Sequence, residues 1–334
     1  MKKLLVILGP TATGKTDLAL RLASLAQGQD PLFPQCELIS CDSRQVYKGL
    51  DIGTGKLPGG KAIVKKGDGF WEINSIKVWM YDVVDPKVRY TVKDYMEQAQ
   101  KVITDIHRRG KLPIIVGGTG LYLKALLEGL PNLAVPIDLK LRGELEKLSL
   151  LQLQEKLRVL SPARWKNLNE SDRKNPRRLL RSIELVHMYP YARISQISKL
   201  KSRNYNILKV GLTAPRQVLK ERIFSRLLTR LDQGMIKEAE ILHKEGLSFE
   251  RMKELGLEYG MLAKILEGAV SREEFITQLS TQILRYSKRQ MTWFKNPSVN
   301  SGQTNWFDIT EPNITLRIEN LVSTWYDSAN DQKD

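Results

Sequence analysis

The fold is decided by the run Leu4-Leu5-Val6-Ile7-Leu8-Gly9-Pro10-Thr11-Ala12-Thr13-Gly14-Lys15-Thr16. An apolar strand leads into a glycine-rich loop, and an amphipathic helix begins at Lys15. This spacing matches a P-loop, in which backbone N–H groups and a helix N-terminus point at a phosphate while a lysine adds positive charge. We expect two linked phosphates to bind at Thr11, Ala12, Thr13, Gly14, Lys15 and Thr16, with Thr16 as a ligand of Mg²⁺. A glycine-rich turn of purely structural purpose is the alternative.

Strands alternate with helices through the first third of the chain, which predicts an α/β fold with a doubly wound parallel sheet. A short strand over 37–41 is followed at once by Asp42, and a strand over 112–116 runs into Gly117-Gly118-Thr119-Gly120. Ligands of such sheets bind beyond the carboxyl ends of the strands. We therefore expect Gly9, Asp42 and Thr119 to converge on one pocket. Asp42 would accept a proton from a nucleophile or hold Mg²⁺, unless it only caps the next helix.

Thr119 is also informative, because the strand of a motor NTPase often ends at this point in a carboxylate. A hydroxyl in its place argues against such an ATPase, although Asp85 could supply the missing carboxylate.

The organisation of the chain changes after residue 131. Charged, leucine-rich helical patterns replace the strand signal, and sheet-like sequence returns at 206–212. The sequence predicts a P-loop core split into 1–131 and 205–297, an inserted all-helical domain over 132–204, and a C-terminal tail over 298–334. Within the core, alternation over 70–74 and 77–81 predicts a β-hairpin that turns near Ser75. Thr91 as N-cap with Asp94 in the third position predicts the start of a helix that ends at Gly110.

The formal charge of +16 and the pI near 9.7 point to a polyanionic partner, with nucleic acid first. Two basic clusters fit that partner: a helix over 175–184, where Arg177 and Arg181 lie four residues apart, and a segment over 285–295 that mixes cations with aromatic rings. A solvated basic surface without a specific partner is the alternative.

Composition limits the location of the protein. No apolar run approaches about twenty residues, the short N-terminal run does not suit a secretory signal, and Cys36 and Cys41 are the only cysteines. We expect a cytoplasmic protein without a membrane segment or a disulfide framework.

The motifs together resemble those of the tRNA dimethylallyltransferase family. The resemblance rests on the P-loop and on four further groups of residues, in family order up to Lys295: Ile39-Ser40-Cys41-Asp42-Ser43-Arg44-Gln45-Val46-Tyr47 with Asp51-Ile52-Gly53-Thr54-Gly55-Lys56, Val116-Gly117-Gly118-Thr119-Gly120-Leu121-Tyr122, Asn175-Pro176-Arg177-Arg178-Leu179, and Lys288-Arg289-Gln290-Met291-Thr292-Trp293-Phe294.

This resemblance implies transfer of a dimethylallyl group from dimethylallyl diphosphate to the N6 amine of the adenosine on the 3′ side of a tRNA anticodon. It implies that Asp42 is the general base, that Thr119 and Lys15 act beside it, and that Arg226 joins the P-loop and Mg²⁺ at the diphosphate. The inserted domain would clamp the anticodon stem-loop, and the enzyme is expected to be a monomer. The residues implied at the tRNA are Asp42, Ser43, Arg44, Gln45, Thr119, Arg142, Arg177, Arg178, Arg181, Lys288, Arg289, Gln290 and Trp293. Glu258 departs from the family pattern, which often has a basic residue there.

Three other classes use similar residues. A P-loop small-molecule kinase would need ATP but not two basic clusters, and an adenylate prenyltransferase would not need the insertion. A non-enzymatic RNA-binding NTPase switch would leave Asp42 and Thr119 without a use.

Overall fold

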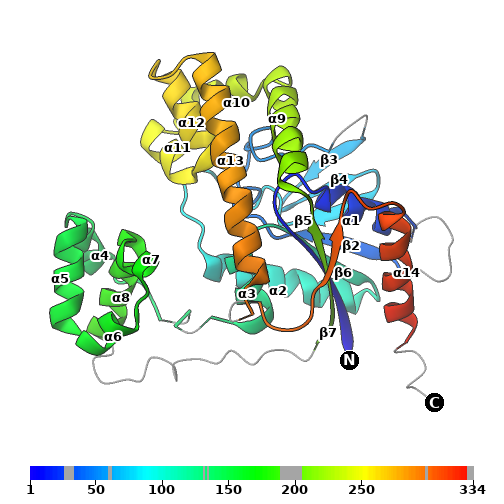
Figure 1. Cartoon of the computed structure of the whole chain (residues 1–334), viewed down its shortest axis with the longest axis horizontal. Coiled ribbons are helices and arrows are strands. Elements are labelled where there is room, and N and C mark those ends of the chain that lie inside the picture. Colours follow the sequence, from blue (N-terminus) through cyan, green and yellow to red (C-terminus); the bar gives the residue numbers. More distant parts are fainter. Residues whose placement is uncertain are drawn as a thin grey trace. The chain divides into compact units, whose positions relative to one another are not determined.

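The computed structural model describes residues 1–25, 34–58, 62–130, 132–133, 135–188, 205–297 and 300–328. The chain divides into two compact units (Figure 1). The first combines Met1–Leu126 with Asn204–Asp334, and the second is Leu127–Arg203. The C-terminal boundary predicted for the helical insertion, at residue 204, lies outside the described residues.

The first unit is built on an eight-stranded sheet with the strand order β3-β4-β5-β2-β6-β1-β7-β8. Strands β5, β2, β6, β1, β7 and β8 run parallel, so the predicted parallel sheet is confirmed. The strands are β1 (Lys2–Leu8), β2 (Cys36–Ser40), β3 (Val64–Gly67), β4 (Phe70–Ile73), β5 (Ile76–Trp79), β6 (Leu112–Gly117), β7 (Tyr205–Thr213) and β8 (Asn305–Asp308).

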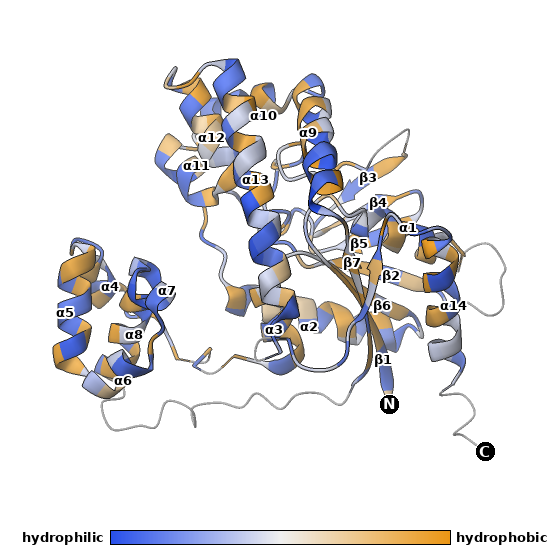
Figure 2. Ribbon diagram, in the orientation of Figure 1, coloured by the Kyte–Doolittle hydropathy of each residue, from blue (hydrophilic) through white to orange (hydrophobic). Residues whose placement is uncertain are grey.

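The central strands are apolar because both faces of the sheet are covered (Figure 2). On one face, α1 (Lys15–Leu25) and α14 (Ile314–Asp327) pack their apolar residues into a core that includes Leu5 and Ile7 of β1. Side chains alternate along a strand, so Leu4 and Val6 face the other way. Helix α2 (Val92–Arg108) packs against β2 and β6 with four fully buried residues, Tyr95, Ala99, Ile103 and Ile106.

Two local signals were read correctly from the sequence. Helix α2 begins with a capping box, in which Thr91 and Asp94 bond each other's backbone N–H groups. The predicted hairpin is β4 and β5, which turn at Asn74 and Ser75, both with a positive φ. Strand β3 adds a third antiparallel strand at the sheet edge.

A group of packed helices follows β7 along the chain (Figure 1). Helix α13 packs on α9 and α12 and runs down to the sheet, where α3 (Gly120–Glu128) begins. The group consists of α9 (Arg216–Asp232), α10 (Met235–Lys244), α11 (Phe249–Leu255), α12 (Leu257–Leu266) and α13 (Arg272–Lys295).

The second unit is helical in its described part and has its own core. Leucines of α5 and α8 form most of it, with Leu157, Leu179 and Ile183 fully buried. The helices are α4 (Leu139–Leu145), α5 (Leu150–Leu160), α6 (Pro162–Asn167), α7 (Glu170–Arg173) and α8 (Pro176–Met188). No helix in the described parts of the chain is long and apolar enough to cross a membrane.

The segment after residue 297 differs from the predicted tail. Strand β8 pairs in parallel with β7, and Ile318 and Val322 of α14 lie in the core beside the sheet. This segment therefore completes the first unit. The sequence concealed it because a four-residue edge strand carries little periodicity.

Candidate active site

The glycine-rich loop lies between β1 and α1 at the carboxyl edge of the sheet. A Cβ atom on Gly9, which has a φ of +144°, would lie 2.4 Å from the carbonyl oxygen of Leu212 on β7. The Thr13 hydroxyl donates to the Pro10 carbonyl at 2.9 Å and is almost fully buried. The loop is thus held against the neighbouring strand and leads into the N-terminus of α1, where N–H groups can bind a phosphate.

Lys15 is the cation of this loop. Its ammonium group donates to the Pro10 carbonyl at 2.6 Å. Burial and the nearby charge of Arg226 lower the pKa of Lys15 to about 7, and the negative charge of Asp42 opposes that shift. Lys15 therefore lies within electrostatic reach of both the predicted base and the predicted diphosphate arginine.

Asp42 and Thr119 follow neighbouring strands, because β2 pairs with β6. One carboxylate oxygen of Asp42 accepts the N–H of Arg44 at 2.8 Å. The N–H of Ser43 donates to the Thr119 hydroxyl at 3.1 Å, and the N–H of Thr119 donates to the carbonyl of Cys41 at 3.1 Å. The two strand ends therefore form one corner that brings Asp42 close to Thr119; that this corner lines one pocket with Gly9 stays a prediction.

Two arginines of α9 lie over the loop at 51–56. A Cβ atom on Gly55 would lie 2.1 Å from the guanidinium of Arg230 and 3.3 Å from that of Arg226. Arg230 also donates to the carbonyl of Gly53 at 3.3 Å and lies 3.9 Å from the carboxylate of Glu258 on α12. The charge of Arg226 acts on Lys15 of the phosphate loop, and Arg230 extends the positive charge one helical turn further.

Two further titratable groups lie near Asp42. Burial raises the pKa of Glu258, and the charge of Asp42 acts in the same direction, whereas Arg230 opposes it. Burial also raises the pKa of Tyr286, which lies beside Thr119, and the charges of Asp42 and Glu258 add to that effect. The phenol therefore stays protonated near neutral pH.

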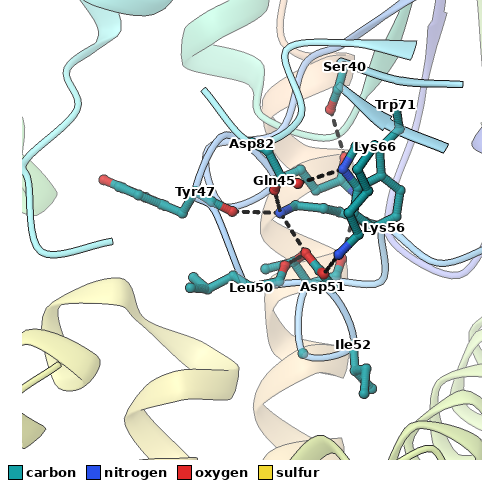
Figure 3. A network of polar contacts seen from close by, with 12 residues as sticks. Ser40, Gln45, Tyr47, Leu50, Asp51, Ile52, Lys56, Lys66, Trp71 and Asp82 are labelled. Carbon is teal, nitrogen blue, oxygen red and sulfur yellow. Dashed lines mark hydrogen bonds and ion pairs between the residues drawn. The ribbon is translucent and has the colours of Figure 1, made fainter. Parts of the chain in front are cut away.

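A buried lysine at the end of the loop at 51–56 ties this loop to neighbouring segments (Figure 3). Lys56 is fully buried, pairs with Asp51 at 3.0 Å and with Asp82, and donates to the carbonyl of Tyr47. Asp82 also accepts the indole N–H of Trp71 at 2.6 Å. The charge of Lys56 is thus compensated inside the protein and is not offered to a ligand.

Glu238 of α10 also holds this loop. This carboxylate accepts three successive backbone N–H groups, those of Asp51 at 2.9 Å, Ile52 at 2.7 Å and Gly53 at 3.0 Å. It also accepts the hydroxyl of Tyr259 at 2.6 Å. The loop over which Arg226 and Arg230 lie is therefore held by Lys56 and by Glu238.

Some residues implied at the tRNA turn inward. The amide oxygen of Gln45 accepts the Ser40 hydroxyl at 2.7 Å, and its nitrogen faces the carbonyls of Thr54 and Gly55 at 3.4 and 3.5 Å (Figure 3). Gln290 is also buried, at 6% exposure, with both ends of its amide bonded to backbone. For Gln290 the implied tRNA contact is wrong, because its polar atoms are already used inside the fold.

Other residues of the same set remain accessible. Lys288 and Arg289 are exposed on α13, and Arg289 lies 5.7 Å from the ring of Tyr286. The half-buried ring of Trp293 packs against Gly120, where a Cβ atom would lie 2.3 Å from it. The guanidinium of Arg44 lies over Gly256, 3.2 Å from the position of a Cβ atom.

Four arginines of the second unit are implied at the tRNA, and they are of two kinds. Arg142 binds the fully buried carboxylate of Glu184 through two hydrogen bonds, at 2.6 and 2.8 Å. Arg181 bonds the same carboxylate at 3.1 Å and also donates to three backbone carbonyls, those of residues 132, 135 and 136. Arg177 is exposed, and Arg178 is exposed and pairs with Asp172. Arg142 and Arg181 therefore hold the unit together, a role that the sequence did not predict.

The donor set of the loop fits Mg²⁺ only in combination with a substrate. Among the described residues, no group of three or more His, Cys, Asp or Glu side chains is placed to hold a metal ion. Thr16, in the first turn of α1, offers a hydroxyl oxygen, which is a ligand of the kind Mg²⁺ takes when substrate phosphates and water complete its shell.

Sequence reasoning missed Arg230 and Glu238, and it included Tyr286 only as one of the aromatic rings of 285–295. The spacing of four residues between Arg226 and Arg230 on one helix was a usable signal. Glu238 carried none, because the sequence does not say which loop a helix will cover.

Comparison with known proteins follows the same motifs. The family model described as IPP transferase matches residues 45–297. A tRNA dimethylallyltransferase 2 of Treponema denticola is 39% identical over 303 residues, which cover 90% of this chain and 94% of that protein. The crystal structure of a full-length tRNA isopentenylpyrophosphate transferase from Bacillus halodurans matches with a TM-score of 0.68 and 30% identity, covering 100% of this chain and 99% of that one. A eukaryotic dimethylallyltransferase acting on tRNA shares the fold, with a TM-score of 0.71 at 22% identity, over 97% of this chain and 80% of that one.

Proposed function

The chain belongs to the IPP transferase family, a group of prenyl transferases that modify tRNA, and we propose that it transfers the dimethylallyl group of dimethylallyl diphosphate to the N6 amine of the adenosine on the 3′ side of the tRNA anticodon. The observation that carries this proposal is the corner where Asp42 and Thr119 meet beside the phosphate loop and Lys15. This corner would join a site for a leaving anion to a site for a nucleophile.

Cationic groups would stabilise the negative charge of the leaving diphosphate. In the reaction the bond between the allylic carbon and the diphosphate oxygen breaks, and the electron pair stays on the diphosphate. Lys15 and Arg226, with the loop N–H groups, would bind that growing negative charge in a partly buried place where charges interact strongly. A bound Mg²⁺, held by Thr16 and the phosphates, would neutralise part of the same charge.

Asp42 would act as the base for the nucleophilic amine. The N6 nitrogen forms the new bond to the allylic carbon and loses one proton, which Asp42 would accept. Because the N–H of Arg44 holds Asp42 and the N–H of Ser43 holds Thr119, both side chains are oriented before the base arrives.

The basic surface supports tRNA as the second substrate. Arg177 in the second unit and Lys288 and Arg289 on α13 present exposed cations that could neutralise phosphates. That the enzyme works as a monomer, and in the cytoplasm, stays a prediction.

The test is nucleoside mass analysis of unmodified tRNA that carries adenosine 3′ of its anticodon. It is incubated with the protein, Mg²⁺ and dimethylallyl diphosphate without ATP, beside a free AMP control. We expect a dimethylallyl adduct on that adenosine alone. An adduct on AMP would favour an adenylate prenyltransferase, and no adduct on either would contradict the proposal and make ATP consumption the next assay.

A further inference from the structure

Gln290 connects two loops of the active site through one side chain. It lies on α13, four residues after Tyr286 and three before Trp293, on the helix face that packs against the turn at 117–120. Its amide oxygen accepts the N–H of Thr11 in the phosphate loop at 2.9 Å. Its amide nitrogen donates to the carbonyl of Gly118 at 2.9 Å.

The orientation of this amide is determined by its two partners. If oxygen and nitrogen were exchanged, the NH₂ group would face an N–H and the oxygen would face a carbonyl, so both hydrogen bonds would become repulsive. The side chain is only 6% exposed, so water cannot compensate for such an exchange. One buried amide therefore holds both loops: its oxygen accepts from the phosphate loop, and its nitrogen donates to the turn at 117–120.

Steric contacts make the connection tight. A Cβ atom on Gly118 would lie 2.2 Å from the amide nitrogen of Gln290, whereas the next nearest side-chain or backbone atoms are at 3.4 Å or more. Any side chain at residue 118 would displace the amide. The backbone of the turn and the amide of α13 are thus in direct contact because residue 118 is a glycine.

The two loops that Gln290 joins serve different halves of the proposed reaction. Thr11 belongs to the loop that would hold the diphosphate, and Gly118 directly precedes Thr119, beside the expected position of the base. From this geometry we propose that Gln290 is a positioning residue, which fixes the distance between the leaving-group half and the nucleophile half of the site. This inference rests on the proposed transfer reaction and adds a residue whose effect is on the rate and not on the grip of tRNA. In reactions of this kind a misplacement of about 1 Å costs about a hundredfold in rate.

The first test replaces Gln290 by Met, which keeps the length and removes both hydrogen bonds. We expect kcat to fall about ten- to a hundredfold, while KM for tRNA stays within about twofold and the salt dependence of tRNA binding is unchanged. Ser280→Ala is the matched control, because this residue lies on the same helix outside the segment 285–295 and its hydroxyl donates to the helix carbonyl of Thr277. It should keep wild-type kinetics and melting temperature.

A second variant covers the case in which Gln290→Met folds poorly. Gln290→Glu keeps the shape and can still accept the N–H of Thr11, but its carboxylate cannot donate to the carbonyl of Gly118. We expect the same loss of kcat, measured at least 15 °C below the melting temperature of each variant. Unchanged kcat in a folded Gln290→Glu variant would overturn the proposal.

The decisive test is a double-mutant cycle with Gly118. Gly118→Ala should lower kcat in the wild-type background, because the new methyl group displaces the amide. In a Gln290→Ser background the space is free, so Gly118→Ala should add little. Additive losses would overturn the proposal, as would a Gln290→Met variant that raises KM for tRNA and flattens its salt dependence with kcat intact. An inactive wild-type enzyme would instead contradict the proposed function itself.

Discussion

Binding of dimethylallyl diphosphate should weaken as the pH rises above 7, because Lys15 must carry a proton to bind the anion. In the free enzyme, burial and the charge of Arg226 lower the pKa of Lys15 to about 7. A bound diphosphate adds negative charge next to the ammonium group and raises that pKa again. Binding therefore takes up a proton, and the affinity is fully present below pH 7.

The size of the effect follows from the same pKa. Lys15 is about half protonated at pH 7, and well above pH 7 each further pH unit lowers its protonated fraction about tenfold, which corresponds to about 1.4 kcal/mol of binding free energy. Between pH 7 and pH 8.5 the dissociation constant should therefore rise about fifteenfold. The loss levels off once the pH reaches the pKa of Lys15 in the complex.

Isothermal titration calorimetry of dimethylallyl diphosphate with Mg²⁺ tests this prediction, at several pH values and in two buffers that differ in ionisation enthalpy. The buffer dependence gives the number of protons taken up at pH 8, which should approach one. Lys15→Arg is the control for titration of the ligand itself, since a guanidinium stays charged throughout this range. An equal pH slope in Lys15→Arg and in the wild type, or no proton uptake at pH 8, would refute the reasoning.

The remaining predictions concern catalysis, tRNA binding and stability. Asp42→Asn should slow single-turnover prenyl transfer about a hundredfold or more and leave tRNA affinity in a filter-binding assay nearly unchanged; retained turnover would remove Asp42 as the base. Arg177→Ala should weaken tRNA binding and reduce the slope of log K against log salt by about one, and an unchanged slope would count against this contact. Arg142→Met should destabilise the protein by about 2–4 kcal/mol in urea denaturation, because the buried Glu184 loses two hydrogen bonds; a variant of unchanged stability that binds tRNA weakly would contradict the structural role. Lys56→Met should cost about 3–5 kcal/mol in the same assay, since two carboxylates lose their buried partner, and a neutral result would contradict the network.

The catalytic edge of the sheet could be predicted because its signals are local. A strand, a glycine-rich loop and a helix start are adjacent in the sequence, and each parallel strand must end at the same edge. Asp42 and Thr119 therefore lie where the sequence placed them, and a capping box located the start of α2.

The partners of buried polar groups could not be predicted, because they come from distant segments. Glu238 bonds the loop at 51–53, and Gln290 bonds Thr11 across 279 positions of sequence. Gln290 directly follows the exposed Lys288 and Arg289, so its neighbours in the sequence do not indicate that its amide is buried. Periodicity describes which face of a helix is apolar but not which polar residue faces inward.

Net charge misled the sequence prediction in a specific way. Arg142 and Arg181 count toward the basic surface, yet both bind the buried Glu184 and compensate its charge. Removing Arg181 together with Arg177 would therefore mix a loss of stability with a loss of phosphate contacts. A salt-dependence experiment on this unit is interpretable only with Arg177 changed alone, because that side chain is exposed while Arg181 also holds three backbone carbonyls of the preceding segment. The salt dependence of tRNA binding should therefore indicate fewer phosphate contacts than the number of arginines on α8 suggests.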